Sequence, residues 1–404
     1  MRTSSLDAPG VVLSAVVLSA IGAVFYNVLP LFLGTVQDSR SLSDAAAGTL
    51  ASAFFLGFTL AAASAYFWIR RMNWRSVTLV FIPIAMGALI AASSIRSLPA
   101  MMLAVFFAGA AFSVLYGIGV TVLGDTSQPA RWFGLKIAAE AGLGALLLAV
   151  FPSTVVTWWG FEGFMLALAV TVLLLAPLLA WLPPRGTKSN SGLPAVPGGN
   201  AAAPCRAALR LALAGVLCFL FSTTLVWAQL ERLAHEAGFE AVMTGNALSL
   251  GLLFAMAGSL LAVALSDRLG SARPLILAGA VILGSLFLLA HADSFPVYRV
   301  AVCGFTLALG MGIPYFIHVV AVLDLEGRYV ILTVPAVGIG VSLAPAIGGV
   351  LSGSGSFLTV LFTGGAATLA AVAAALIALH LGRPPAIDRK WMDGNAGQAH
   401  DPRL

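Results

Sequence analysis

The sequence predicts an all-α integral membrane protein of about twelve transmembrane helices, arranged as two parallel six-helix repeats. Three observations lead to this prediction. Of the 404 residues, 60% are hydrophobic and only 9% are charged, whereas a soluble domain carries about a quarter charged residues. Apolar runs of roughly 20 residues, long enough to cross a bilayer as a helix, recur along the whole chain. The two halves of the sequence also match each other at one fixed offset.

This offset is 197 residues, and no gap is needed from about residue 45 to 133. Leucines and alanines would coincide by chance in so apolar a chain, but turn glycines, a proline and loop arginines would not. The matched pairs are Gly48 with Gly245, Ser52 with Ser249, Leu56 with Leu253, Arg71 with Arg268, Gly87 with Gly284, Ser97 with Ser294, Pro99 with Pro296 and Arg131 with Arg328. An internal repeat of this length decides the fold before any local motif does.

Hydropathy places the spans at residues 11–35, 44–68, 76–95, 99–123, 132–152, 162–183, 208–230, 245–266, 273–291, 297–322, 330–352 and 357–381. The domains expected from these spans are an N-terminal six-helix bundle (1–183), a cytoplasmic linker (184–207), a C-terminal six-helix bundle (208–382) and a cytoplasmic tail (383–404). The linker is rich in Pro, Gly, Ser and Asn, a composition typical of flexible connections.

Basic residues predict the orientation in the membrane. Sixteen of the 21 lysines and arginines fall on the side of the N-terminus, four fall on the other side, and Lys136 lies within a span. Because cytoplasmic loops carry the excess of basic residues, we expect both termini in the cytoplasm of a plasma membrane, in bacteria the inner membrane. Six spans in each half, an even number, make the repeats parallel. The N-terminus has no basic region followed by a cleavage site, so the first span is expected to stay attached.

Composition also excludes several classes of function. The three cysteines are scattered, which implies neither a disulfide framework nor a metal site. No phosphate-binding loop, metal-ligand cluster or nucleophile arrangement is present, so we expect no enzyme, no cofactor and no ATP-driven pump. The net charge of +5 is explained by membrane orientation and not by nucleic-acid binding. The expected partners are the lipid bilayer, a small-molecule substrate and, as an option, protons, for a monomeric protein.

A polar turn follows the second span of each half. In the second half it contains Asp267, Arg268, Gly270 and Arg273 after Gly258, and the corresponding turn of the first half contains Arg70, Arg71, Asn73 and Arg75. Together with the six-plus-six spans and the long central linker, these turns resemble the Major Facilitator Superfamily. The resemblance covers nearly the whole chain. It implies a secondary transporter with a central cavity lined by spans 1, 4, 7 and 10, which opens alternately to either side.

The resemblance further implies that these turns close the cytoplasmic face. Arg70 stands where the family pattern has an aspartate, so we expect the charges of the two latches to be exchanged. Asp267 should reach the start of span 5 near Arg131, because a helix N-terminus favours a carboxylate. The second latch should join Arg70 and Arg71 to Asp324 and Glu326, before span 11 and near Arg328. The alternative is that these charges sit in solvated loops and only set the orientation. Asn73 replaces a glycine, and Asn enters the left-handed region more easily than most residues.

Charged residues at membrane depth are costly and mark functional sites by default. Lys136 and Glu140 of span 5 lie four residues apart on one helical face, where they can pair. Glu140 lies about 14 Å from Arg131 along the helix, near mid-membrane. The equivalent residues in the second half are uncharged, so the pair breaks the repeat symmetry. It is either a site for substrate and proton chemistry or a self-neutralised structural pair.

Other polar residues inside the spans are further candidates for the substrate or proton site. Glu231 lies toward the outer end of span 7 with Trp227 and Gln229, and it faces either the cavity or its neighbour Arg232. The remaining candidates are Tyr26 and Asn27 in span 1, Tyr116 in span 4, and Tyr315 and His318 in span 10. Ordinary hydrogen bonding between helices is the alternative for each of them.

The function predicted from these features is secondary active transport of a small organic solute by alternating access, with proton coupling through Glu140 and Lys136 as an option. The alternative is a polytopic membrane protein that does not transport, such as a sensor or a lipid-handling enzyme. A polar cavity between the halves favours the first function, and a lateral lipid groove with clustered histidines or acids favours the second.

Overall fold

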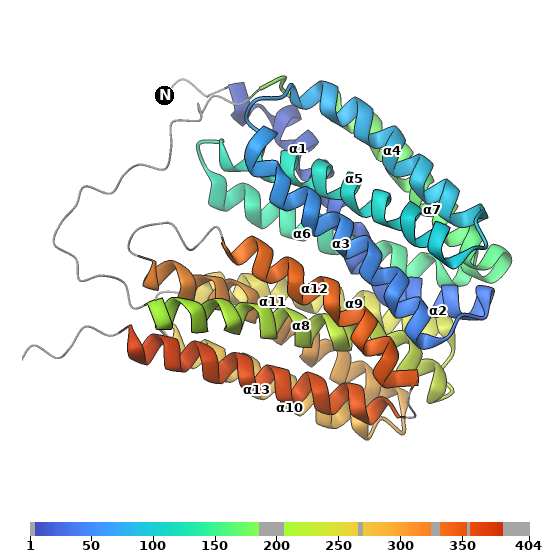
Figure 1. Ribbon diagram of the computed structural model, residues 1–404, viewed down its shortest axis with the longest axis vertical. Helices are drawn as coiled ribbons and strands as arrows, with labels where there is room; N and C mark the ends of the chain where they lie inside the picture. The colour runs from blue at the N-terminus through green and yellow to red at the C-terminus, as the bar shows by residue number, and fades with distance from the viewer. Residues whose placement is uncertain (1–4, 186–205, 266–269, 325–331, 354–355, 383–404) are drawn as a thin grey trace, which may run out of the picture.

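The structure, a computed structural model, describes residues 5–185, 206–265, 270–324, 332–353 and 356–382, and in these ranges it contains helices and connecting loops but no strand. Figure 1 shows two helical bundles lying against each other, one from each half of the chain. The α-helices of the first half are α1 (Pro9–Asn27), α2 (Leu29–Arg40), α3 (Asp44–Trp68), α4 (Trp74–Ser94), α5 (Leu98–Gly124), α6 (Pro129–Val150) and α7 (Thr157–Leu175). Those of the second half are α8 (Arg206–Glu236), α9 (Ala241–Leu265), α10 (Ala272–Ala290), α11 (Phe295–Leu323), α12 (Thr333–Gly353) and α13 (Phe357–Leu381).

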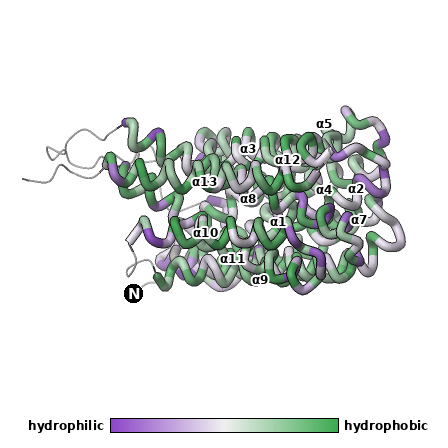
Figure 2. The backbone as a smooth tube through the Cα atoms, turned by 90° about the horizontal axis from the view of Figure 1, so that it is seen from below, coloured by the Kyte–Doolittle hydropathy of each residue, from purple (hydrophilic) through white to green (hydrophobic). Residues whose placement is uncertain are grey.

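Twelve membrane crossings follow from these helices. Eleven segments of the described residues are long and apolar enough to span a membrane, and one of them, Arg131–Leu179, is 49 residues long. It contains two crossings, α6 and α7, joined by the π-helical turn Pro152–Val156 and a sharp bend at Gly160, where φ is 52°. Hydrophilic residues gather toward the two ends of the bundle in Figure 2, as expected for a protein whose middle lies in lipid. The prediction of an all-α membrane protein with about twelve spans is confirmed.

We call the end at which the chain begins the N-terminal face and the other end the opposite face. Asp7 fixes one loop of the N-terminal face, because its Oδ1 accepts a hydrogen bond of 2.9 Å from the Ser127 amide. The α3–α4 turn lies at the same face, and the α2–α3 and α4–α5 loops lie at the opposite face (Figure 1).

The first crossing is broken at Val28 into α1 and α2, where the sequence predicted one continuous span. Pro30 explains the break. Proline has no N–H for the carbonyl four residues earlier, and its ring clashes with that carbonyl. The carbonyl in question belongs to Tyr26, which therefore lacks its regular helical partner and can accept a hydrogen bond from elsewhere in the molecule.

The offset of 197 residues relates the helices of the two halves in space. It superimposes the bounds of α3 on those of α9, and it moves α1 and α2 together onto α8. Contacts between the halves obey it too. The Gly48 backbone packs against the Pro345 carbonyl, and 197 residues later Gly245 packs against the carbonyl of Leu148, which is itself 197 residues before Pro345. Glycine is needed at both positions, since a Cβ would collide with the facing backbone.

One turn residue differs from its prediction. Gly270 adopts φ of 62°, in the left-handed region, but Asn73 has φ of −77° and is extended. Asn73 instead caps α4, because its side-chain oxygen accepts hydrogen bonds from the amides of Arg75 and Ser76. The asparagine therefore replaces the glycine by capping the next helix and not by entering the left-handed region.

The two halves are packed together at the opposite face and part toward the N-terminal face. The helix α3 packs on α12 of the other half, and all of its buried residues lie between Ala47 and Gly57. The helix α6 packs on α9, and between Arg131 and Glu140 its only buried residue is Lys136, whereas buried positions are frequent from Ala141 to Leu148. Burial therefore ends partway along each contact helix, where the halves separate.

Candidate functional site

One face of α6 carries the candidate site. Lys136, Glu140, Gly144 and Leu148 follow one another at intervals of four residues and so form a single stripe. The last two residues touch the second half: Gly144 lies against Leu252 of α9, and the Leu148 carbonyl lies against Gly245. The first two residues lie one and two turns beyond these contacts, toward the N-terminal face. The pair thus sits where the halves begin to part.

Two side chains, those of Glu140 and Tyr116, surround the ammonium group of Lys136. Its Nζ lies 2.7 Å from Oε1 of Glu140 and donates a hydrogen bond of 2.9 Å to the Tyr116 hydroxyl. The same Nζ lies 4.6 Å from the centre of the Tyr116 ring, within cation–π range. The Lys136 side chain is 6% exposed and that of Glu140 is 14% exposed. Burial of both members makes the pair hydrogen-bonded and electrically neutral as a unit.

Asn27 links this pair to α1. Its Nδ2 donates a hydrogen bond of 2.8 Å to the backbone carbonyl of Glu140, and its side chain packs against Gly144. The structure therefore brings together Lys136, Glu140, Tyr116 and Asn27, all of which the sequence named as candidates. An ammonium has three N–H donors, and Glu140 and Tyr116 account for two of them. The arrangement can hold one anionic group on Lys136 and one proton on Glu140.

A second polar group joins the two halves next to Asn27, on the side toward the opposite face. The Trp227 Nε1 of α8 donates a hydrogen bond of 2.9 Å to the Tyr26 carbonyl, the one that lacks its regular helical partner because of Pro30. The Tyr26 hydroxyl lies beside Thr224, also of α8. Tyr26 and Trp227 therefore belong to the closed contact between α1 and α8.

Further along α8, Arg232 reaches two carboxylates of the first half. Its Nη1 lies 3.4 Å from Oδ1 of Asp38, and its Nε lies 4.0 Å from Oδ1 of Asp44. Gln37 donates a hydrogen bond of 2.9 Å to that same oxygen of Asp44. The two Arg232 contacts cross from one half to the other, so they must break when the halves separate at the opposite face. We refer to Asp38, Asp44, Glu231 and Arg232 as the gate cluster.

Glu231 lies in the same closed contact between the halves, whereas Gln229 packs inside the second half. The Glu231 residue is 8% exposed, and its carboxylate lies directly against the backbone of Gly34 in α2. Its Oε2 has no hydrogen-bond partner. Gln229 is buried and packs against Gly348 of α12, within the second half.

Tyr315 and His318 are not part of either group. The Tyr315 hydroxyl donates a hydrogen bond of 3.3 Å to the Ala262 carbonyl, which joins α11 to α9 inside the second half. His318 is exposed near the end of α11. Both positions fit the alternative of ordinary contacts.

The predicted latch at the N-terminal face lies partly outside the described residues, which exclude Asp267, Arg268, Glu326 and Arg328. Arg70 pairs within its own half, with Nη1 2.5 Å from Oδ2 of Asp125. Arg75 donates to the Leu182 carbonyl, and the Cζ of Arg131 lies 4.8 Å from the ring centre of Trp132. Of the other predicted latch residues, Arg71 and Arg273 are exposed and Asp324 is buried. The exchange of charges between latches stays a prediction, which a conformation closed at this face would test.

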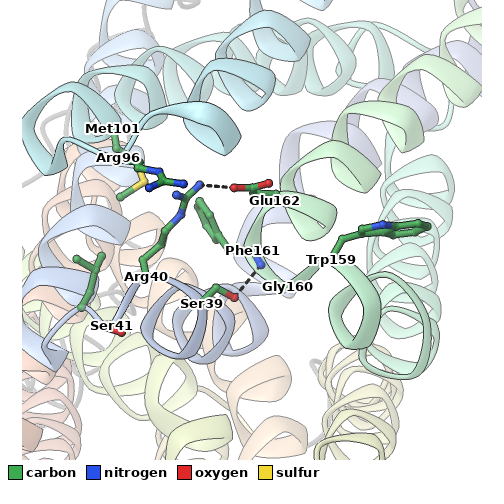
Figure 3. Close-up of a pocket in the computed structure, with 10 residues that line it drawn as sticks. Ser39, Arg40, Ser41, Arg96, Met101, Trp159, Gly160, Phe161 and Glu162 are labelled. Atoms are coloured by element: carbon green, nitrogen blue, oxygen red, sulfur yellow. Dashed lines mark hydrogen bonds and ion pairs between the residues drawn. The ribbon is translucent and has the colours of Figure 1, made fainter.

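A pocket of about 480 Å³ opens at the opposite face within the first half (Figure 3). Arg40 lies in it, forms a 3.2 Å ion pair with Glu162, and donates to the Ser93 carbonyl. Arg96 lies next to Arg40, and the Ser39 hydroxyl accepts a 2.9 Å hydrogen bond from the Phe161 amide beside the bend at Gly160. These contacts tie α2, α4 and α7 together.

Sequence reasoning missed Gly34, Asp38 and Asp44 as gate residues. The repeat offset contained the signal, because Gly34 is the equivalent of Glu231. The offset alone does not show that the two residues touch, because that requires the arrangement of the halves in space.

The fold agrees with comparisons to known proteins. The family model described as Major Facilitator Superfamily matches residues 12–330. A comparison with curated protein sequences gave no match.

Several solved structures are similar to this chain at low sequence identity. A bacterial homologue of the human lysosomal transporter Spinster, inward-facing and unoccupied, has 13% identity and a TM-score of 0.67, over 93% of this chain and 97% of that chain. A D-xylose–proton symporter has 13% identity and a TM-score of 0.70, over 91% and 96%. A nucleoside transporter has 13% identity and a TM-score of 0.65, over 92% and 100%. The likeness to these structures concerns the fold, and the family match covers most of the chain, which therefore belongs to the Major Facilitator Superfamily.

Proposed function

We propose that this protein is a secondary active transporter that moves a small organic anion together with a proton by alternating access. The observation that carries the proposal is the buried Lys136–Glu140 pair at the point where the halves part. The family membership indicates a transporter and not an enzyme. Nucleic acid is not among the proposed partners.

Coupling follows from the charge balance of the pair. With Glu140 ionised, the pair is neutral, and an anionic solute on Lys136 would leave one uncompensated negative charge in a buried site. Burial of an unpaired charge is costly. A proton on Glu140 removes that excess, so solute and proton bind together. Tyr116 and Asn27 hold the pair in place from α5 and α1 and offer further polar groups to the solute.

Alternating access follows from the repeat. Equivalent contacts, α3 on α12 and α9 on α6, relate the two halves by an approximate two-fold axis. Rocking of one parallel repeat against the other about such an axis would close the N-terminal face and open the opposite face. The site lies near the middle of α6, so either opening would expose it.

We also propose that the N-terminal face is cytoplasmic, so that this conformation is inward-facing. The basis is the excess of basic residues on that side of the sequence. Ser76→Cys and Ser97→Cys, both at exposed positions and at opposite faces, form a matched pair for its test in cysteine-free protein. A membrane-impermeant thiol reagent added to intact cells should label the cysteine at position 97 and spare that at position 76. The reverse pattern would invert the orientation.

The transport proposal is tested with protein reconstituted in liposomes. An inwardly directed proton gradient should drive accumulation of at least one member of a panel of small carboxylates and organic phosphates. Glu140→Gln should abolish accumulation while exchange of solute across the membrane continues, because the neutral glutamine mimics the protonated acid. Glu236→Gln, at an exposed position at the end of α8, is the matched control and should leave accumulation unchanged. Unchanged accumulation in Glu140→Gln would refute proton coupling through this residue.

A further inference from the structure

The contact between Glu231 and Gly34 lies on the axis that relates the two halves. The two residues are 197 apart and occupy equivalent places in α8 and α2. Under an approximate two-fold rotation, a residue and its equivalent can touch each other only at the axis itself. The Glu231 carboxylate fills the space that the missing side chain of Gly34 leaves. This carboxylate therefore sits at the centre of the closed contact, where separation of the halves must expose it.

The groups around Glu231 do not neutralise it. Arg232 extends toward Asp38 of α2 and Asp44 of α3, so one guanidinium serves a cluster of three carboxylates. Burial and the nearby Asp38 both disfavour a negative charge on Glu231, and Arg232 opposes them more weakly. Tyr298 of α11 lies nearby, but its hydroxyl donates to the Leu230 carbonyl at 2.9 Å. The Oε2 of Glu231 has no hydrogen-bond partner.

We propose that Glu231 is a proton-binding site that controls closure of the opposite face. It is neutral when the halves are closed there and ionised when they are open. On opening, the O–H bond of the carboxyl breaks and the proton passes to water at the opposite face. On closing, the carboxylate takes a proton back from the same side. The site differs from the Lys136–Glu140 pair, in which the cation contacts the carboxylate directly, although it rests on the alternating-access function proposed above.

The direction of the pH effect follows from linkage. The closed contact holds one proton more than the open one, so a lower pH favours closure and a higher pH favours opening. For one linked proton the open-to-closed ratio changes by up to about tenfold per pH unit. The open-to-closed ratio depends on pH only over the range in which Glu231 titrates in the closed and in the open environment.

The experiment measures the width of the opposite face directly. Ser97 and Ser294 are repeat equivalents, both exposed, in the α4–α5 and α10–α11 loops, and neither side chain caps its helix. Ser97→Cys and Ser294→Cys in a cysteine-free background would carry spin labels, and the distance between the labels would be recorded from pH 5 to pH 9 in lipid nanodiscs. We expect the population with the longer distance to grow as the pH rises.

Three further variants test whether Glu231 causes the pH dependence of the label distance. Glu231→Gln, which has the same size and no charge, should keep the short distance and lose the pH dependence. Asp38→Asn and Glu140→Gln should retain the dependence. An unaltered pH profile in Glu231→Gln would overturn the proposal. If Glu140→Gln alone removed the dependence, the proposal for Glu231 would also be wrong, whereas failure of Glu140→Gln to uncouple transport would affect only the proposed function.

A second measurement does not require Glu231→Gln to fold. Infrared difference spectra of Glu140→Gln protein, recorded across the same pH range, should show the carbonyl band of a buried protonated carboxyl in the closed state. The band should disappear over the pH interval in which the label distance lengthens. A closed state without this band would overturn the proposal.

Discussion

Glu140 and Glu231 are both buried glutamates in membrane-spanning helices, and they differ in how they are neutralised. Glu140 has a cation four residues away on its own helix, at 2.7 Å. Glu231 lies on the contact between the halves, and the nearest guanidinium reaches away from it to the other half. Rigid-body motion of the halves leaves the first arrangement intact and takes the second apart.

The two glutamates can therefore perform two separate tasks, solute coupling and control of closure. A pair inside one helix keeps its balance in every conformation, so only a ligand or a proton can disturb it. An acid on the axis changes its environment with each movement of the halves, so the movement itself changes its charge. We therefore assign solute coupling to the first site and control of closure to the second.

The largest effect is expected from breaking the pair inside α6. Glu140→Gln leaves the Lys136 ammonium buried with the Tyr116 hydroxyl as its remaining close partner. Loss of one member of a buried pair costs about 3 to 5 kcal/mol, because the other charge stays uncompensated. Thermal unfolding in detergent should show a loss at the lower end of this range.

The matched control replaces both charges at once. Lys136→Met with Glu140→Leu should regain most of the lost stability, since exchange of a buried pair for apolar residues of similar volume is often neutral. The double variant should still be unable to transport. Recovery of transport would mean that the pair is structural.

A smaller effect is expected at the axis. Gly34→Ala places a methyl group where the Glu231 carboxylate now lies, and such overpacking costs about 1 to 3 kcal/mol. The cost applies only when the halves are closed at the opposite face, so the label distance between positions 97 and 294 should shift to longer values at every pH. Gly87→Ala is the control, because no atom lies within 4 Å of its would-be Cβ.

Removal of the Glu231 carboxylate tests whether its collision with the new methyl group causes the longer label distance in Gly34→Ala. Gly34→Ala combined with Glu231→Ala should return the labels to the short distance, since the two groups no longer compete for one space. A persistent long distance in the double variant would show that the methyl group collides with something other than Glu231.

The fold was predictable because the turn residues, as well as the apolar runs, match between the two halves. Glycines at close contacts, such as Gly48 and Gly245, tolerate no side chain, so the sequence retains them at the same offset. The break at Val28 was not predicted, because hydropathy averages over a whole span and does not register the effect of one proline. The role of Asn73 was predicted wrongly, since glycine and asparagine can end a turn by different means, and only backbone angles distinguish them.

The candidate site was predictable in part for the same kind of reason. Lys136 and Glu140 lie within one helix, so their spacing alone brings them together. Tyr116 and Asn27 join them from other helices, and no rule of spacing supplies such a contact. Glu231 and Gly34 meet only because the axis passes between them, which requires the arrangement of the two halves.

The hydrogen bond from Trp227 to Tyr26 contributes less than the contact on the axis. Trp227→Phe removes the donor but keeps a large aromatic side chain, and one net hydrogen bond is worth about 0.5 to 1.5 kcal/mol. The open population at the opposite face should rise several-fold, without a change in its pH dependence. Trp158→Phe, at an exposed position at the start of α7, should have no effect on the label distance.

The smallest effect is expected from Arg232, although it makes the only ion pairs that join the halves among those found in the described residues. Its side chain is 24% exposed and that of Asp38 is 54% exposed, so water screens the attraction. Pairs of this kind contribute about 0.2 to 1 kcal/mol. Arg232→Gln should therefore widen the label distance in only a small fraction of molecules, and added salt should reduce the difference from the parent. The substitution also removes the nearest positive charge from Glu231, which makes the neutral acid more favourable still. Closure in Arg232→Gln should consequently persist to higher pH than in the parent, whereas an Arg232 that neutralised Glu231 directly would give a gate that opens at every pH.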